Sequence, residues 1–254
     1  MSNASHDLTG RTALVTGGTR GIGRAIAFAL ARAGARVLVS SRKAPAVDAT
    51  VQAIRAEGGL ADGIPANVGR LDEAHRLAAN ALELAGGVDI LVNNAAANPV
   101  FGPITDTSPE AFAKIMDVNV RAPFEIAKRL LSSMQARGHG AVVNISSIGG
   151  VSPEPYLGIY SVSKAALISL TKVMAREWGP SGVRANAICP GLIKTDFSQA
   201  LWGNDALLQR MMGEQPIPRV GTPEDVAELA LFLVCDAAAF CTGGVYMVDG
   251  GYTI

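Results

Sequence analysis

The feature that most constrains this chain is a regular alternation of short apolar runs with longer helical patterns. The apolar runs, which we interpret as strands, are Thr12–Thr16, Arg36–Ser40, Leu60–Pro65, Asp89–Val92, Ala141–Ile145, Val183–Ile188 and Val245–Val248. Helical patterns cover Gly21–Ala33, Asp72–Ala85, Pro109–Arg137, Tyr160–Trp178 and Pro223–Cys235. Continuously apolar strands separated by helices are typical of a parallel sheet covered on both faces. The alternation predicts one α/β domain over residues 1–254, with a doubly wound parallel sheet of about seven strands.

One long segment, residues 192–220, breaks this alternation. Long inserts in compact domains are often lids or binding loops, so we expect a substrate lid there. The segment carries Phe197, Trp202, Met211 and Met212, which suggest an apolar pocket. A surface elaboration packed by the same side chains remains the alternative.

Composition and charge exclude several classes of protein. Lys plus Arg equals Asp plus Glu, at 22 each, so nothing favours nucleic acid or an anionic membrane as a partner. No apolar run approaches the roughly 18 residues that span a bilayer, and the polar N-terminus has no signal-peptide core. Cys189, Cys235 and Cys241 form neither a disulfide framework nor a metal-binding spacing. We therefore expect a reduced, cytoplasmic protein without a metal.

A glycine-rich turn follows the first predicted strand and opens the first helix. Its glycines are Gly17, Gly21 and Gly23. Glycines let a backbone approach a pyrophosphate closely, and a helix N-terminus offers it free N–H groups and a positive dipole. Tight strand–helix turns also use glycine, but the position after the first strand of an α/β chain favours a dinucleotide site.

The end of the second strand indicates which dinucleotide would bind. A site for NAD usually has an acidic residue there, whereas this chain reads Ser40-Ser41-Arg42-Lys43. Arg42 could pair with a 2′-phosphate, and Arg20 in the glycine turn could add a second cation. We therefore expect NADP(H), although both arginines could simply be solvated. Asn94 and Ala95, at the end of the fourth strand, would let a flat cofactor approach.

Ser147, Tyr160 and Lys164 form a second group. Tyr160 and Lys164 are four residues apart in a helical pattern, which places them on one face. An ammonium about 4 Å from a phenol oxygen is worth roughly 4 kcal/mol at an effective dielectric near 20. That would lower the phenol pKa by about three units, close to neutral pH, where general acid–base catalysis works best. Ser147, after the fifth strand, could hold a substrate oxygen.

With these motifs in place, the chain resembles the short-chain dehydrogenase/reductase family from Leu8 to Gly251. The matching motifs are Gly17-x-x-x-Gly21-x-Gly23, Asn93-Asn94-Ala95, Asn119, Ser147, Tyr160-x-x-x-Lys164 and Pro190-Gly191. The resemblance implies a single-domain Rossmann fold and hydride transfer between NADP(H) and a small-molecule carbonyl or alcohol. Within the family, the chain is similar to the NADPH-dependent carbonyl reductases that act on retinal and aromatic ketones. Those are peroxisomal in animals, whereas this chain does not end in a peroxisomal tripeptide.

The resemblance also implies roles for individual residues. Tyr160 would exchange the proton, Ser147 would orient the carbonyl, and Lys164 would bind the nicotinamide ribose. Asn119 would hold a water that links Lys164 to solvent. Asn67 stands where the family has an aspartate that contacts the adenine. The family further implies a homotetramer, built on the two long helices and the C-terminal strand.

The expected cofactor site combines these motifs with their neighbours. It comprises Gly17, Thr19, Arg20, Gly21, Ile22, Gly23, Ser41, Arg42, Asn67, Val68, Asn94, Ala95, Tyr160, Lys164, Pro190, Gly191, Ile193 and Thr195. Three other functions stay open. They are a 3-oxoacyl-thioester reductase that meets an acyl carrier protein, an NAD-dependent alcohol or sugar dehydrogenase, and a dinucleotide-binding module without activity.

Overall fold

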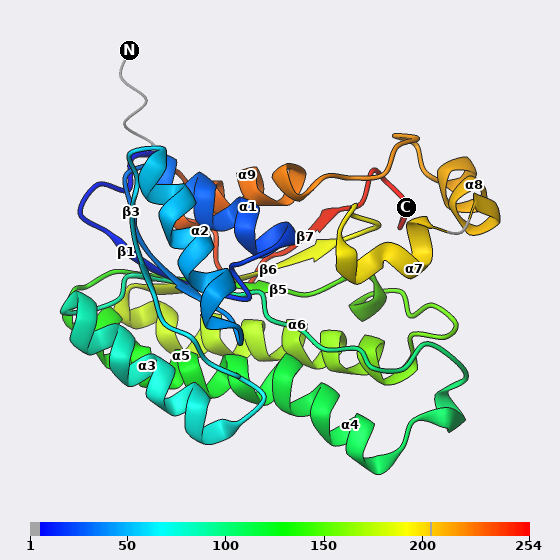
Figure 1. Cartoon of the computed structure of the whole chain (residues 1–254), viewed down its shortest axis with the longest axis horizontal. Coiled ribbons are helices and arrows are strands. Elements are labelled where there is room, and N and C mark those ends of the chain that lie inside the picture. Colours follow the sequence, from blue (N-terminus) through cyan, green and yellow to red (C-terminus); the bar gives the residue numbers. More distant parts are fainter. Residues whose placement is uncertain (1–5, 204) are drawn as a thin grey trace.

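The computed structural model of the chain describes residues 6–203 and 205–254. Residues 1–5 of the expected domain and residue 204 of the expected lid lie outside this part. The centre is a parallel sheet of seven strands in the order β3-β2-β1-β4-β5-β6-β7 (Figure 1). The strands are β1 (Thr12–Thr16), β2 (Arg36–Ser40), β3 (Leu60–Gly63), β4 (Ile90–Asn93), β5 (Gly140–Ile145), β6 (Val183–Pro190) and β7 (Val245–Val248). The structure confirms the predicted single Rossmann-type domain.

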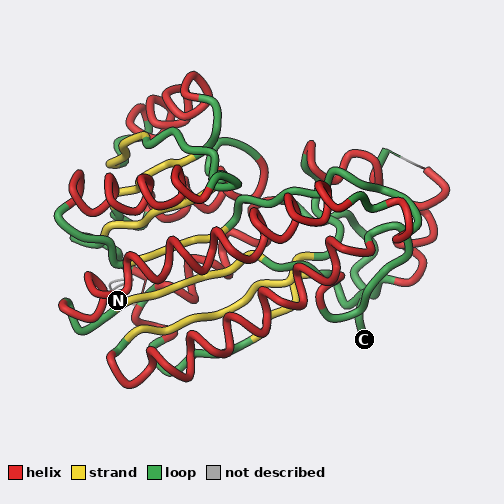
Figure 2. Tube along the Cα trace, turned by 90° about the horizontal axis from the view of Figure 1, so that it is seen from below, coloured by secondary structure: helices red, strands yellow, loops and turns green. Residues whose placement is uncertain are grey.

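Helices cover both faces of the sheet. One layer contains α1 (Gly21–Arg32), α2 (Ala44–Ala56) and α9 (Pro223–Val234), and the other contains α3 (Leu71–Ala85), α5 (Ala122–Ala136) and α6 (Gly158–Trp178). Figure 1 shows the first layer above the sheet and the second below it. In Figure 2 the lower helices run along the strands, and the loops beyond the strand ends gather on the right with the C-terminus.

Alternating strand residues build the two halves of the core. In β1, Ala13 and Val15 pack into the core on the side of α1, whereas Leu14 packs on the side of α3. Successive side chains of a strand point to opposite faces, so a strand covered on both faces must be apolar throughout. Each fully buried Val or Leu contributes roughly 1.5–3 kcal/mol of transfer free energy.

Three elements differ from the prediction. Helix α2 was not expected, because Pro45 in its first turn and mixed polarity mask its pattern. The helix expected over Pro109–Arg137 is divided into α4 (Pro109–Met116), a π-helical turn (Asp117–Arg121) and α5. The expected lid contains two helices, α7 (Gln199–Trp202) and α8 (Asp205–Glu214).

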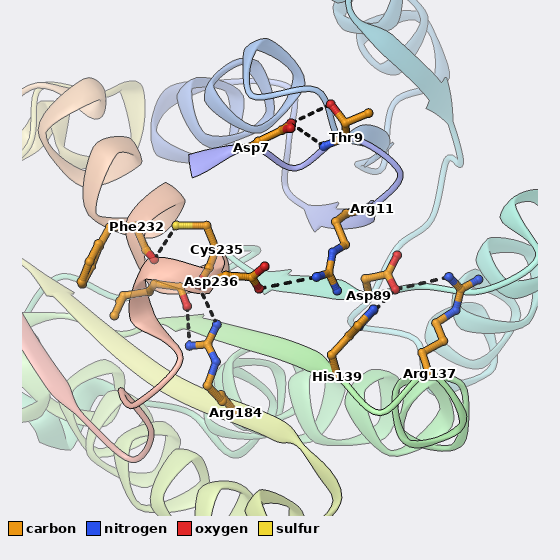
Figure 3. Close-up of polar contacts among 11 residues, drawn as sticks. Asp7, Thr9, Arg11, Asp89, Arg137, His139, Arg184, Phe232, Cys235 and Asp236 are labelled. Atoms are coloured by element: carbon orange, nitrogen blue, oxygen red, sulfur yellow. Dashed lines mark hydrogen bonds and ion pairs between the residues drawn. The ribbon is translucent and has the colours of Figure 1, made fainter. Parts of the chain in front are cut away.

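The amino ends of the strands are closed by structural polar contacts, drawn in Figure 3. Asp89, just before β4, is almost fully buried; it accepts from the Thr12 N–H at 2.7 Å and from Arg137 at 3.3 Å. Arg184 of β6 donates to the carbonyls of Leu233 and Cys235 at the end of α9. Such contacts satisfy helix-end carbonyls. This edge therefore holds the layers together.

The opposite edge contains the topological switch point. After β1 the chain proceeds to β2 and β3 on one side, and from β4 onward it continues on the other. Connections leave β1 and β4 in opposite directions, so a crevice opens between their carboxyl ends. The functional residues expected from the sequence lie around this crevice.

Candidate active site

A cleft of about 580 Å³ occupies the carboxyl edge of the sheet. This volume is within the range of small-molecule and cofactor sites. The expected site residues that line it are Gly17, Thr19, Arg20, Gly21, Ile22, Ser41, Arg42, Asn67, Val68, Asn94, Ala95, Ser147, Tyr160, Lys164, Pro190, Gly191, Ile193 and Thr195. Gly23 and Asn119 do not line the cleft.

The glycine turn brings the backbone to the floor of the cleft. Gly17 and Gly21 have φ values of +64° and +49°, a region that favours glycine. A Cβ on Gly23 would collide with the Gly17 carbonyl and the Asn94 side chain, so this glycine is needed for packing. Its role is therefore to shape the turn from behind.

The start of α1 fits an anionic group. Arg20, the N-cap residue, makes no side-chain cap, and the first turn contains no acidic residue. The first N–H groups of an α-helix have no partner within the helix, and the helix dipole adds positive potential there. These N–H groups face a cleft that is also lined by Arg20 and Arg42. The residues present thus fit the pyrophosphate of a dinucleotide.

Asn94 braces the glycine turn. Its Nδ2 donates to the carbonyls of Thr16 and Gly17, at 3.0 and 3.1 Å. The Thr16 hydroxyl in turn accepts from the N–H groups of Asn94 and Ala95, at 3.1 and 3.2 Å. These bonds join the ends of β1 and β4 at the switch point. Asn94 therefore holds the cleft in shape as well as lining it.

The end of β2 carries the groups that could distinguish one dinucleotide from another. Arg42 is exposed and makes no ion pair within the described part of the chain, whereas Arg20 lies 3.8 Å from the carboxylate of Asp196. The buried Ser40 hydroxyl lines the cleft and has no hydrogen-bond partner among the described residues. A buried hydroxyl without a partner is costly, which points to a polar group of a ligand at this position. Ser40 was not among the residues expected from the sequence.

Asn67 lies at the expected adenine end of the cleft. Its Oδ1 accepts from the Gly69 N–H at 3.2 Å, and its own N–H donates to Glu73 at 2.8 Å. The neighbouring lining residues Lys114 and Val118 come from α4 and the π-helical turn, and the sequence did not predict them. They are four residues apart on one helical face, a spacing that many helical pairs share, so it did not distinguish them in the sequence.

Ser147, Tyr160 and Lys164 meet in the same cleft. Ser147 ends the loop after β5, and its Oγ accepts from the Gly149 N–H at 3.1 Å. Tyr160 lies in the first turn of α6, and its ring centroid is 6.1 Å from that of Phe197. Lys164, only 2 % exposed, directs its Nζ to the Ile145 carbonyl at 2.7 Å. The same Nζ lies 5.5 Å from the centroid of the Tyr160 ring, so the ammonium and the phenol ring are neighbours in the cleft.

The pKa expected for the phenol is wrong. Burial raises the pKa of Tyr160 to about 12, and a hydrogen bond with Ser147 opposes this only in part. Burial also lowers the pKa of Lys164 to about 8. Because both groups are removed from water, desolvation favours the neutral form of each. The phenol consequently keeps its proton at neutral pH.

The Asn119 side chain is held by protein partners, and the water expected at this residue stays a prediction. It is fully buried in the π-helical turn, and its Oδ1 accepts from the Ala97 N–H at 2.8 Å. Its Nδ2 donates to the Ala97 carbonyl and to the Ser163 hydroxyl, at 3.0 and 2.9 Å. Both donor positions of the amide are thus occupied by protein. Ser163 is a further residue that the sequence did not single out.

Of the four large apolar side chains that the sequence places in the lid, Phe197 lines the cleft, whereas Trp202, Met211 and Met212 do not. The Trp202 indole donates to the Thr195 carbonyl at 2.9 Å, and Met211 is buried within the lid segment. Within the described ranges there is no group of three metal-binding side chains. No helix in those ranges is long and apolar enough to cross a membrane.

Comparisons with known proteins agree with this geometry. A family model described as enoyl-(acyl carrier protein) reductase matches residues 17–253. Dehydrogenase/reductase SDR family member 4 of Sus scrofa is 47% identical over 244 residues, or 96% of this chain and 88% of the relative. A 7α-hydroxysteroid dehydrogenase, solved with NADH and 7-oxo glycochenodeoxycholic acid, superimposes with a TM-score of 0.94 at 33% identity, covering 99% of this chain and 97% of the other. A gluconate 5-dehydrogenase from Burkholderia cenocepacia J2315, solved with NADP and tartrate, has a TM-score of 0.94 at 32% identity and 98% coverage of both chains.

Proposed function

The chain belongs to the short-chain dehydrogenase/reductase family, and we propose that it moves a hydride between NADP(H) and the carbonyl carbon of a ketone or aldehyde. As a family member it is an oxidoreductase that acts on alcohol or carbonyl groups of small molecules. One observation carries the proposal: a single cleft joins the uncapped start of α1 to Ser147, Tyr160 and Lys164. The first element suits a pyrophosphate, and the three side chains suit a reacting carbonyl.

When bound, the cofactor supplies or accepts the hydride. The Ser147 Oγ accepts from the Gly149 N–H, and its own hydrogen, which meets the Tyr160 phenol in the structure, is the one that it would donate to the substrate oxygen. During reduction Tyr160 gives its phenolic proton to that oxygen, and during oxidation it takes the proton back. A pKa of about 12 keeps Tyr160 protonated at neutral pH, which suits the reductive direction. The nearby Lys164 ammonium stabilises the phenolate that this transfer leaves.

The preference for NADP(H) rests on charge at the end of β2. Arg42 lines the cleft without an ion pair among the described residues, and no carboxylate stands within Ser40–Lys43. A guanidinium can pair with a 2′-phosphate, whereas NAD offers it only hydroxyls. The unpartnered Ser40 hydroxyl beside it supports the same end of the cofactor.

Residues 192–220 act as the substrate lid. The two ends of this segment are joined, since the Lys194 N–H donates to the Gly221 carbonyl at 2.8 Å and the Gly221 N–H to Leu192 at 2.9 Å. A loop with fixed ends can open and close as a unit. Phe197 brings an exposed aromatic face to Tyr160, which favours an apolar substituent on the substrate carbonyl.

The protein assembles as a homotetramer and works in the cytoplasm. Exposed apolar side chains on α4, α5 and α6, among them Phe112, Phe124 and Val173, support helix-to-helix contact between copies. The open edge of β7, with Met247, supports a second contact. Three free cysteines support a reducing compartment. Sedimentation showing a monomer at micromolar concentration would contradict the assembly.

The test is to follow NADPH and NADH oxidation with aromatic and aliphatic ketones, aldehydes, a keto sugar and a 3-oxoacyl thioester. We expect NADPH oxidation with apolar ketones or aldehydes. The variant Tyr160→Phe should lose nearly all turnover and still bind NADPH, because it lacks only the phenolic hydroxyl that carries the proton. If the protein binds NADPH but no carbonyl compound oxidises it, the alternative of a dinucleotide-binding module without activity would replace the proposal. A preference for the thioester or for NADH would replace the proposal with the corresponding alternative.

A further inference from the structure

The helix turn that carries Tyr160 has no cap of its own. Leu157, at the N-cap position of α6, makes no side-chain hydrogen bond, and the first turn contains no acidic residue. The helix opens with Gly158 and Ile159, both weak helix formers. Uncapped first turns fray readily, because their N–H groups have no partner within the helix. Some other contact must fix Tyr160 in place.

Ser163 supplies such a contact. It is fully buried in α6, and its Oγ donates to the Tyr160 carbonyl at 2.6 Å. The same Oγ accepts from the Asn119 Nδ2 at 2.9 Å. The Ser163 hydroxyl thus donates one hydrogen bond and accepts another. Through these two bonds it connects the first turn of α6 to the π-helical turn that contains Asn119.

The same chain of hydrogen bonds continues from Asn119 to the cofactor side of the cleft. Asn119 binds both the N–H and the carbonyl of Ala97, and Ala97 lines the cleft in the loop after β4. Four hydrogen bonds, two of them buried and two partly buried, therefore connect that loop to the backbone of Tyr160 through the Asn119 amide and the Ser163 hydroxyl. Ser163 itself does not line the cleft.

We propose that Ser163 is a positioning residue: through Asn119 it fixes the turn carrying Tyr160 relative to the loop at Ala97. This rests on the proposed function, in which Tyr160 must face a carbonyl carbon beside the cofactor. Small displacements of a reacting group strongly reduce the rate, whereas binding of a cofactor along the rest of the cleft is little affected. Loss of the Ser163 hydroxyl should therefore lower kcat more than it raises the KM for NADPH.

The test compares Ser163→Ala with a matched control, Ser161→Ala. Ser161 lies on the same helix and is 1 % exposed, but its hydroxyl has no hydrogen-bond partner among the described residues. Ser163→Ala should lower kcat about tenfold, the equivalent of one buried hydrogen bond, and leave the KM for NADPH within about twofold. Ser161→Ala should leave both near the wild-type values. Ser163→Thr, which keeps the hydroxyl, should recover most of the loss, since Thr171 already makes a similar bond to the preceding turn of this helix.

Hydrogen exchange separates this proposal from the proposed function. In Ser163→Ala the amides of residues 95–98 and 160–164 should exchange faster than in wild type, and in Ser161→Ala they should not. These rates need no substrate, so they test Ser163 even if wild type reduces no carbonyl. Equal losses in both alanine variants, an unchanged kcat in Ser163→Ala, or unchanged exchange at both segments would overturn the proposal.

Discussion

Replacement of Lys164 by methionine should stabilise the protein while removing its activity. Lys164 is almost fully buried, and within the described part of the chain its ammonium has one hydrogen bond, to the Ile145 carbonyl. No carboxylate pairs with it among the described residues. A buried charge without a counter-ion is retained at a cost in folding free energy. Methionine has nearly the same length and no charge, so it can fill the same space.

The magnitude follows from the pKa of Lys164, which burial lowers from 10.5 to about 8. Each tenfold change in proton affinity corresponds to about 1.4 kcal/mol, so the charged form costs about 3 kcal/mol at pH 7. Against this gain stands the lost bond to the Ile145 carbonyl, worth roughly 1–2 kcal/mol. We expect Lys164→Met to raise the free energy of unfolding by about 1–2 kcal/mol at pH 7, with turnover lost.

The pH dependence identifies the cause. The folded pKa lies below the unfolded one, so the unfolded state of the wild type binds more protons between pH 8 and 10.5. Wild-type stability from this group therefore rises with pH across that window. The methionine variant lacks this contribution. The amount by which its free energy of unfolding exceeds that of the wild type should therefore shrink as pH rises from 8 to 10. Other titrating groups are common to both proteins and cancel in the difference.

The assay is urea unfolding without cofactor at pH 6 to 10, at one fixed protein concentration because of the expected assembly. Lys172→Met is the control, since Lys172 is an exposed lysine on the same helix and should change stability little. A wild type more stable than Lys164→Met at pH 7 would refute the reasoning. So would an advantage that stays constant between pH 8 and 10.

Three further predictions concern the cofactor end and the lid. Arg42→Ala should raise the KM for NADPH about tenfold, because a charge-assisted hydrogen bond is worth roughly 1.5–3 kcal/mol, and should leave the KM for NADH unchanged. Lys43→Ala removes the adjacent cation, which lies outside the cleft, and should change neither KM. Gly23→Ala should abolish binding of both dinucleotides by calorimetry, since its Cβ would collide with the turn after β1. Asp225→Ala should cost about 1 kcal/mol in urea unfolding at pH 7, because the Arg219 guanidinium holds the pKa of that carboxyl well below its usual range. That folded pKa is depressed, so the difference should fade as pH drops below about 4.

The fold was largely predictable because each strand is buried on both faces. A strand covered by helices above and below must be apolar at every position, and such runs stand out from the helices between them. Helix α2 was not predicted, because its few buried residues, such as Val47 and Ile54, are separated by polar and small residues and give only a weak helical pattern. The division of the long helix at Asp117–Arg121 was also hidden, since one extra residue in a turn hardly changes a helical pattern.

The grouping of the expected cofactor residues around one cleft was predictable for a related reason. Its glycines, its strand-end residues and Arg42 are adjacent in sequence to the strands that position them, so chain order and strand order together place them. Ser163, Ser40 and Lys114 were not predictable. A serine within a helix, a serine ending a strand and an exposed lysine are each ordinary in sequence, and only their partners in space distinguish them.

The phenol pKa shows most clearly where spacing stops being informative. Four residues of separation place Tyr160 and Lys164 on one helical face, but spacing carries no information about water. An ammonium close to the phenol oxygen at an intermediate dielectric would lower the phenol pKa, whereas the structure directs that ammonium to the Ile145 carbonyl and buries both groups. Desolvation then dominates and drives the pKa of Tyr160 up and that of Lys164 down. Under the proposed function, the burial that raises the phenol pKa also keeps on Tyr160 the proton that carbonyl reduction consumes.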